Sequence, residues 1–161
     1  MREASILAVF IVFFIIQLSL HGVLFSFEFA NLTLLFVLAS VNFGGLRQAI
    51  VLCVIGGVLL DFFSSAVDGS FLLGLLLAVV VVYFFVLSIS AKENLLPFLI
   101  GSVVLGTVSF WLPSMALGYE TFAYGYFFGR QIWFELLFNL VLAYPVFVIY
   151  NSVNNYFKQN K

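Results

Sequence analysis

Long apolar runs alternate with short polar or turn-forming clusters along the whole chain. Six runs are bounded by Gly, Asn, Ser or charged residues, and most approach the roughly 20 residues that a helix needs to cross a bilayer core of about 30 Å. The pattern predicts an all-α, polytopic membrane helix bundle that forms one transmembrane domain over residues 1–161. The predicted transmembrane helices are 4–27, 32–43, 49–63, 71–89, 95–117 and 132–150.

Composition supports a membrane setting. Hydrophobic residues make up 65% of the 161 residues and charged residues only 8%, a balance far from that of a soluble domain. The net charge of −1 gives no basic surface, so we expect no nucleic-acid partner. The single cysteine, Cys53, cannot form an internal disulfide or a multi-cysteine metal site.

The second run is the short one, because 12 residues rise only about 18 Å as a helix. It could be a re-entrant segment, and the distribution of cations decides between the two topologies. Six spans leave only Arg130 outside and place five cations on the cytoplasmic side, namely Arg2, Arg47, Lys92, Lys158 and Lys161. A re-entrant second segment leaves two cations inside and four outside. We therefore predict six transmembrane helices with both termini cytoplasmic.

The third run carries a stripe of small residues that ends in an acid. Ala49, Cys53, Gly57 and Asp61 recur every four residues, so they share one helix face. Small faces let helices approach closely, and a charge in hydrocarbon costs about 2.5 kcal/mol or more without water or a partner. The stripe is predicted to face protein. Asp61 is predicted to be buried with a partner, or else to touch headgroups or cap the next helix.

The last run carries a matching polar stripe. Its members are Gln131, Glu135, Asn139 and Ala143. Arg130 lies at the outer end of this run, at a depth similar to that of Asp61 and Glu135. We expect Arg130 to pair with Asp61 or Glu135 and to tie the sixth span to the third.

Candidate chemistry is sparse. The chain contains no H-E-x-x-H, no G-x-S-x-G and no paired-acid motif of an intramembrane protease. The lone His21 has no second ligand at a metal-binding spacing. We expect a protein without enzymatic activity, metal or cofactor.

Several short motifs together resemble the rod-shape-determining MreD family. They are Gln17 late in the first span, "ANL" at Ala30–Leu32, the block "GGVLLDFFSSAVDGSFLLGLL" with Gly57, Asp61 and Gly69, and Asn139 ahead of "LAYP". The resemblance covers nearly the whole chain, and the block from Gly57 to Gly69 is its most specific part. The chain departs from the family pattern where Ala30 replaces a proline and where Asp68 precedes Gly69.

This resemblance implies a non-enzymatic subunit of the bacterial cell-elongation complex in the cytoplasmic membrane. Such a subunit would bind an MreC-like protein and, through it, act with MreB, RodA and a class B penicillin-binding protein in peptidoglycan synthesis. The protein would recognise this partner through the faces of its transmembrane helices and its short loops. It would also contact membrane lipid.

A second hypothesis is the substrate-binding subunit of an energy-coupling-factor vitamin transporter, which is similar in size and span number. Ala4 and Ala8 supply the small-xxx-small spacing typical of the first helix of those proteins. Its substrate site would be near the external side, where four residues are expected to cluster: Asp61, Glu135, Trp111 and Trp133. A structural subunit of some other complex is the third hypothesis.

Overall fold

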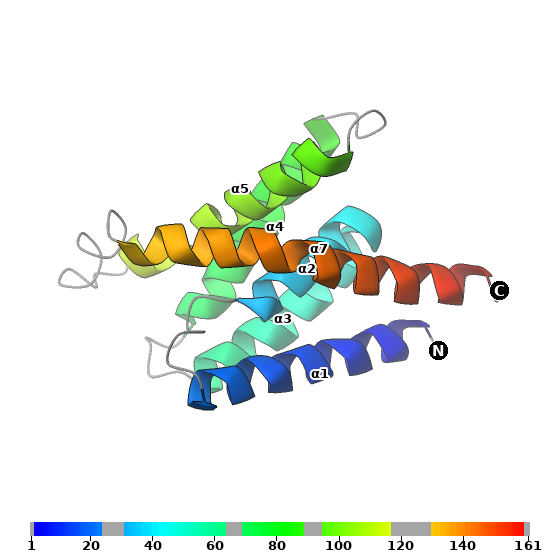
Figure 1. Ribbon diagram of the computed structural model, residues 1–161, viewed down its shortest axis with the longest axis horizontal. Coiled ribbons are helices and arrows are strands. Elements are labelled where there is room, and N and C mark those ends of the chain that lie inside the picture. Colours follow the sequence, from blue (N-terminus) through cyan, green and yellow to red (C-terminus); the bar gives the residue numbers. More distant parts are fainter. Residues whose placement is uncertain (1, 24–30, 64–68, 89–94, 117–129, 160–161) are drawn as a thin grey trace.

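The computed structural model describes residues 2–23, 31–63, 69–88, 95–116 and 130–159 (Figure 1). Within these ranges the regular elements are six helices and no strand. The helices are α1 (Arg2–Val23), α2 (Leu32–Phe43), α3 (Leu46–Phe63), α4 (Ser70–Ser88), α5 (Leu95–Ala116) and α7 (Arg130–Gln159). The predicted all-α fold is therefore confirmed for the described part of the chain.

The helix bounds agree best with the prediction in the middle of the chain. The second predicted helix, 32–43, matches α2 at both ends. The last helix differs most, because α7 continues to Gln159 rather than ending near residue 150. The segment after Tyr150 contains no Gly or Pro, and its buried Asn154 is bonded to α2, so the helix has a physical reason to continue. The predicted end of the first span, at residue 27, lies outside the described residues.

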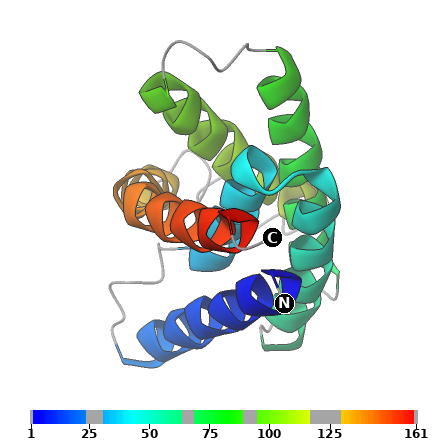
Figure 2. The same cartoon turned by 90° about the vertical axis from the view of Figure 1, so that its right-hand side faces the viewer.

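The short helix α2 occupies the centre of the molecule. Each of the other five described helices packs against it, with α1 on one side, α4 and α5 on the opposite side, and α3 and α7 flanking it (Figure 2). Every residue from Leu32 to Val41 is buried. A helix that is apolar all round is stable only when it is enclosed. The N-cap of α2, Asn31, is buried, and its last two residues, Asn42 and Phe43, are half-buried, so both ends lie against other helices.

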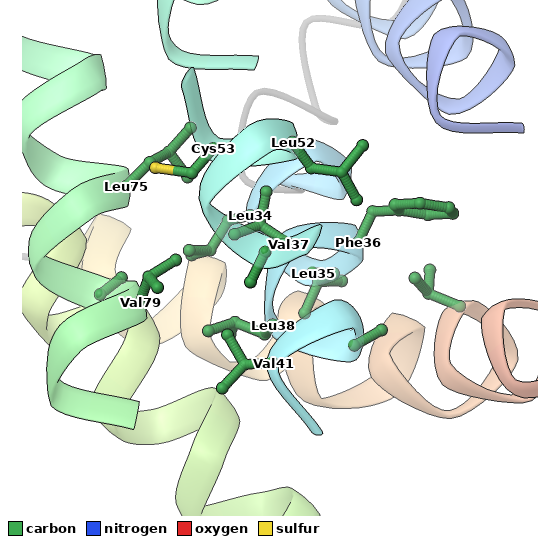
Figure 3. Close-up of a cluster of buried hydrophobic side chains, with 14 of the residues drawn as sticks. Leu34, Leu35, Phe36, Val37, Leu38, Val41, Leu52, Cys53, Leu75 and Val79 are labelled. Atoms are coloured by element: carbon green, nitrogen blue, oxygen red, sulfur yellow. The ribbon is translucent and has the colours of Figure 1, made fainter. Parts of the chain in front are cut away.

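Side chains of α2 interlock with those of its neighbours to form the core. Figure 3 shows the side chains of α2 facing Leu52 and Cys53 of α3 and Leu75 and Val79 of α4. On another side of α2, the ring of Phe36 meets Tyr150 of α7 edge-on, with ring centroids 5.3 Å apart. Such pairs contribute about 0.5–1.5 kcal/mol beyond area burial. Cys53 is fully buried and packs as a small apolar residue.

Close backbone contacts join α3 to α4 and α4 to α5. A Cβ atom built on Gly57 would lie 2.6 Å from the Cα of Leu72, so only glycine fits at this crossing of α3 and α4. A Cβ atom on Gly74 would collide with the backbone oxygen of Phe110 on α5. The predicted small-residue stripe of α3 is therefore confirmed as a protein-facing surface, since Ala49, Cys53 and Gly57 are all buried.

The outer surface of the described helices is rich in large apolar side chains. Two helical segments are long and apolar enough to cross a membrane, Leu46–Phe63 and Trp133–Phe157, and most of their residues are not buried. The apolar parts of the other helices are shorter within the described residues. The beginning of α1 and the end of α7 lie at the same end of the molecule (Figure 1).

Candidate functional site

The candidate site is a set of buried polar side chains around the N-terminal end of α2. Gln17 of α1 is the first of them. Its Oε1 accepts two hydrogen bonds from Thr33, one from the backbone N–H and one from the hydroxyl, both at 2.8 Å. Both residues are buried. Because the first N–H groups of a helix have no partner within the helix, Gln17 acts as a cap supplied by a different helix.

Asn139 of α7 supplies the second cap. Its Oδ1 accepts a hydrogen bond from the backbone N–H of Asn31 at 3.0 Å, and its Nδ2 donates to Thr107 Oγ1 of α5 at 3.2 Å. Asn31 in turn is the N-cap of α2, with its Oδ1 accepting from the N–H of Leu34 at 2.9 Å. Asn139 is fully buried, and this single side chain of α7 forms hydrogen bonds with both the start of α2 and α5.

Glu135 lies one turn before Asn139 on α7. Its Oε2 accepts a hydrogen bond from Trp111 Nε1 of α5 at 2.6 Å. The side chain is 6% exposed. The predicted polar stripe of α7 is therefore buried at Glu135, Asn139 and Ala143, and it faces α5 and the start of α2.

The opposite end of α2 is bonded to α7 as well. Asn154 Nδ2 donates to the backbone carbonyl of Phe43, the last residue of α2, at 2.9 Å. The chain then turns at Gly44 and Gly45, and Gly45 has a φ of 98° that favours glycine. A Cβ atom on Gly44 would collide with the hydroxyl of Tyr150. Both ends of the central helix are thus held by side chains of α7.

These contacts provide partners for the backbone groups at the two ends of α2. A short helix that ends inside a bundle exposes unpaired N–H and C=O groups where water is scarce, and each unpaired buried group costs several kcal/mol in an apolar surrounding. Gln17, Asn31 and Asn139 satisfy N–H groups at one end of α2, and Asn154 satisfies a carbonyl at the other. Most of the buried amide side chains therefore position α2. We call this set the α2 anchor.

Asp61 has a separate role at the junction of α3 and α4. Its Oδ1 accepts from the N–H of Phe71 at 2.9 Å and its Oδ2 from the N–H of Leu72 at 3.2 Å. A carboxylate at a helix N-terminus also interacts favourably with the helix dipole. Of the alternatives stated for Asp61, the structure shows the cap of the following helix. Gly69, with a φ of 88°, forms the turn that starts α4.

The predicted tie through Arg130 involves a side chain outside the part of the chain that the structure describes. Arg130 begins α7, and the bonds that the structure describes for Asp61 and Glu135 go to other groups. The predicted external cluster is assembled only in part. Trp111 and Glu135 meet, Asp61 caps α4, and Trp133 is 68% exposed on the outside of α7.

Sequence reasoning missed several members of the α2 anchor. Asn31 directly precedes an apolar run, which is a typical N-cap signal, so its role could have been predicted. Asn154 lies in the polar end of α7, and Thr107, the partner of the anchor residue Asn139, is one of four hydroxyl residues in α5. Neither carries a local signal, because only the packing of helices distant in sequence brings each one to its partner.

The described side chains of this arrangement permit hydrogen bonding and, at the Glu135 carboxyl, proton binding. Among the described residues, no three His, Cys, Asp or Glu side chains come together in a group that could hold a metal ion. Comparisons with protein-family models, curated proteins and solved structures found no significant match. Arguments about function therefore rest on the sequence and on this structure.

Proposed function

We propose that this protein is a multi-pass membrane protein whose role is to bind other membrane proteins rather than to catalyse a reaction. The observation that carries the proposal is that the distribution of polar and apolar side chains is the reverse of that in a soluble protein. Amide and carboxyl side chains lie inside the bundle, whereas large apolar side chains cover its outside. The exposed apolar residues include Val12 and Ile15 of α1, Val54 and Val58 of α3, Val80 and Phe84 of α4, and Val141 and Val148 of α7.

Physical chemistry favours lipid as the surrounding of such a molecule. Monomeric soluble proteins rarely expose contiguous apolar patches larger than a few hundred Å². Helices in a bilayer instead associate through close packing, small residues and buried hydrogen bonds, because lipid is as apolar as their side chains. Gly57, Gly74 and the α2 anchor supply these features. The beginning of α1 and the end of α7 lie at the same end of the molecule, and this agrees with an even number of membrane crossings that leaves both termini on one side.

Within this class, the proposed role is that of a subunit of the bacterial cell-elongation complex that binds an MreC-like protein. The resemblance of the block from Gly57 to Gly69 to the MreD family supports this role. The structure gives the block a physical meaning, because Gly57 permits the α3–α4 crossing and Asp61 caps α4. The buried polar side chains position helices, which leaves the outer faces of the bundle for a partner helix.

A tryptophan scan of exposed valines tests the proposal. Each of five helices carries an exposed valine whose replacement leaves the core unchanged: Val12 (α1), Val54 (α3), Val80 (α4), Val108 (α5) and Val141 (α7). Each variant is co-expressed with the MreC homologue of the same genome, and the tagged homologue is purified in mild detergent. We expect one variant, or two on adjacent helices, to lose co-purification while the others retain it.

Two results would contradict the proposal. If the unaltered chain does not co-purify with the MreC homologue, the elongation role is wrong. If the purified chain stays monodisperse in buffer without detergent, the membrane setting is wrong. Tight binding of a vitamin by the purified chain would instead favour the transporter subunit, for which the pair of Trp111 and Glu135 would be the first residues to mutate.

A further inference from the structure

Glu135 differs from the other buried polar residues because it can carry a charge. Its carboxyl is 6% exposed and accepts a hydrogen bond from the indole of Trp111 at 2.6 Å, and Asn139 follows one turn along the same face of α7. One neutral donor is a small compensation for a full negative charge inside an apolar bundle, since such a charge is strongly disfavoured without a cation, water or a proton.

The helices packed against α7 bring few charged groups toward Glu135. The sequences of α2 and α5 contain no charged or titratable residue, and Glu3 lies at the opposite end of α1. On α7 itself, Tyr144 is exposed more than two turns away. His21 and Arg130 also lie near this end of α1 and α7, and their side chains, like residues 24–30 and 117–129, lie outside the described part.

The position of Asn139 links Glu135 to the central helix. The planar amide of Asn139 presents its Nδ2 to Thr107 and its Oδ1 to the backbone N–H of Asn31, and it lies one turn from the Glu135 carboxyl on the same face of α7. A carboxylate attracts an N–H donor roughly twice as strongly as a neutral carboxyl does. Because both ends of the amide move together, a change of charge on Glu135 alters the bond that caps α2.

We propose that Glu135 is a reversible proton-binding site that controls how firmly the N-terminal end of α2 is held. A hydronium ion in the surrounding water transfers one proton to a carboxylate oxygen of Glu135, so one O–H bond of hydronium breaks, one O–H bond of the carboxyl forms, and a water molecule is left. The ionised form draws the Asn139 amide toward Glu135, and the protonated form releases it. The proposal concerns the isolated chain and does not depend on the identity of a partner.

The two tryptophans of the chain make the site measurable. Trp133 is exposed and Trp111 contacts Glu135, so Trp133→Phe leaves a single reporter at the site. The emission of this variant in detergent is recorded from about pH 4 to about pH 10, a range that covers the ordinary pKa values of Glu and His. We expect one transition that fits a single proton. It should vanish when Glu135→Gln is added and remain when His21→Asn is added.

A second readout tests the link to α2. Amide hydrogen exchange at residues 31–34 is normalised to that of Phe71 and Leu72, which Asp61 caps on α4. The normalised protection of α2 should change across the same pH range, and Asn139→Ala should remove this change without removing the Trp111 transition. A flat Trp111 emission, or a transition that Glu135→Gln leaves intact, would overturn the proton site. Normalised protection of α2 that is constant with pH would overturn its control of α2.

The test stays decisive if Glu135→Gln does not fold. Infrared difference spectra of the Trp133→Phe variant between the two ends of the pH range then report the site directly. A carbonyl band of a protonated carboxyl in an apolar surrounding, which disappears at the alkaline end, supports the proposal. The absence of that band throughout the range contradicts it.

Discussion

Replacing Asn139 by alanine tests whether the α2 anchor stabilises the fold. The side chain is fully buried, accepts from Asn31 N–H at 3.0 Å and donates to Thr107 at 3.2 Å. Asn139→Ala removes the acceptor and leaves a backbone N–H unpaired at the start of α2. We expect the free energy of unfolding to fall, mainly because of this unpaired group.

The magnitude follows from the two bonds that are lost. A buried donor without a partner costs about 1–3 kcal/mol. The Thr107 hydroxyl can turn to a carbonyl of its own helix, so its contribution is small. Hydrogen bonds between helices in a bilayer average only about 0.6 kcal/mol, so the lower half of the range applies if the unfolded state also finds partners. We therefore expect a loss of about 1–3 kcal/mol for Asn139→Ala.

The chain supplies a matched control on the same helix. Asn155 donates to Asn151 at 3.1 Å, but this pair is exposed, so Asn155→Ala should change stability by less than about 0.5 kcal/mol. Both variants are unfolded reversibly by a denaturing detergent titrated into mild-detergent micelles, and the loss of helix is followed by circular dichroism. Asn139→Leu, which keeps the branched shape of the side chain and fills the cavity, separates the lost bond from the cavity.

Equal stability of Asn139→Ala and Asn155→Ala would refute the reasoning. So would a stabilised Asn139→Leu, because it would mean that Asn31 does not need the acceptor. A large loss in Asn139→Ala that Asn139→Leu restores would assign the effect to packing rather than to the cap.

Substitutions at three other positions have defined outcomes in the same unfolding assay. Gln17→Leu should cost about 1–3 kcal/mol because it removes the acceptor of both bonds from Thr33, whereas Gln17→Glu keeps an acceptor and should cost less; the reverse order would contradict the cap. Asp61→Ala should cost about 0.5–2 kcal/mol and raise hydrogen exchange in the first turn of α4, and Asp61→Asn should do so less; unchanged exchange would speak against the cap. Gly57→Ala should cost about 1–3 kcal/mol because its Cβ would meet the Leu72 backbone at 2.6 Å, and an unchanged stability would rule out this crossing.

The local features of this protein were predictable from sequence. The apolar runs predict the helices, and the bounds of α2 match at both ends because Asn31 is a local start signal and the pair Gly44–Gly45 a local stop signal. The four-residue spacing in α3 and α7 predicts which faces are buried, since that spacing is a property of the helix itself.

The partners of the polar residues were decided by tertiary structure. Asp61 was expected to be buried with a partner, or else to touch headgroups or cap the next helix, and the structure shows it capping α4. The weakest predicted segment, α2, is the central helix around which the others pack. Nothing in its own 12 residues distinguishes an enclosed helix from a short membrane segment, because both are apolar on all sides.

Sequence by itself determined where helices form and which of their faces avoid lipid or water. Only the tertiary structure decided which side chain forms a hydrogen bond with which backbone group, because the two residues of each pair are far apart in sequence. Asn31 and Asn139 are 108 residues apart, and Asn154 and Phe43 are 111 apart. Their bonds exist because α2 ends inside the bundle, where each unpaired N–H or C=O group must find a partner on a neighbouring helix.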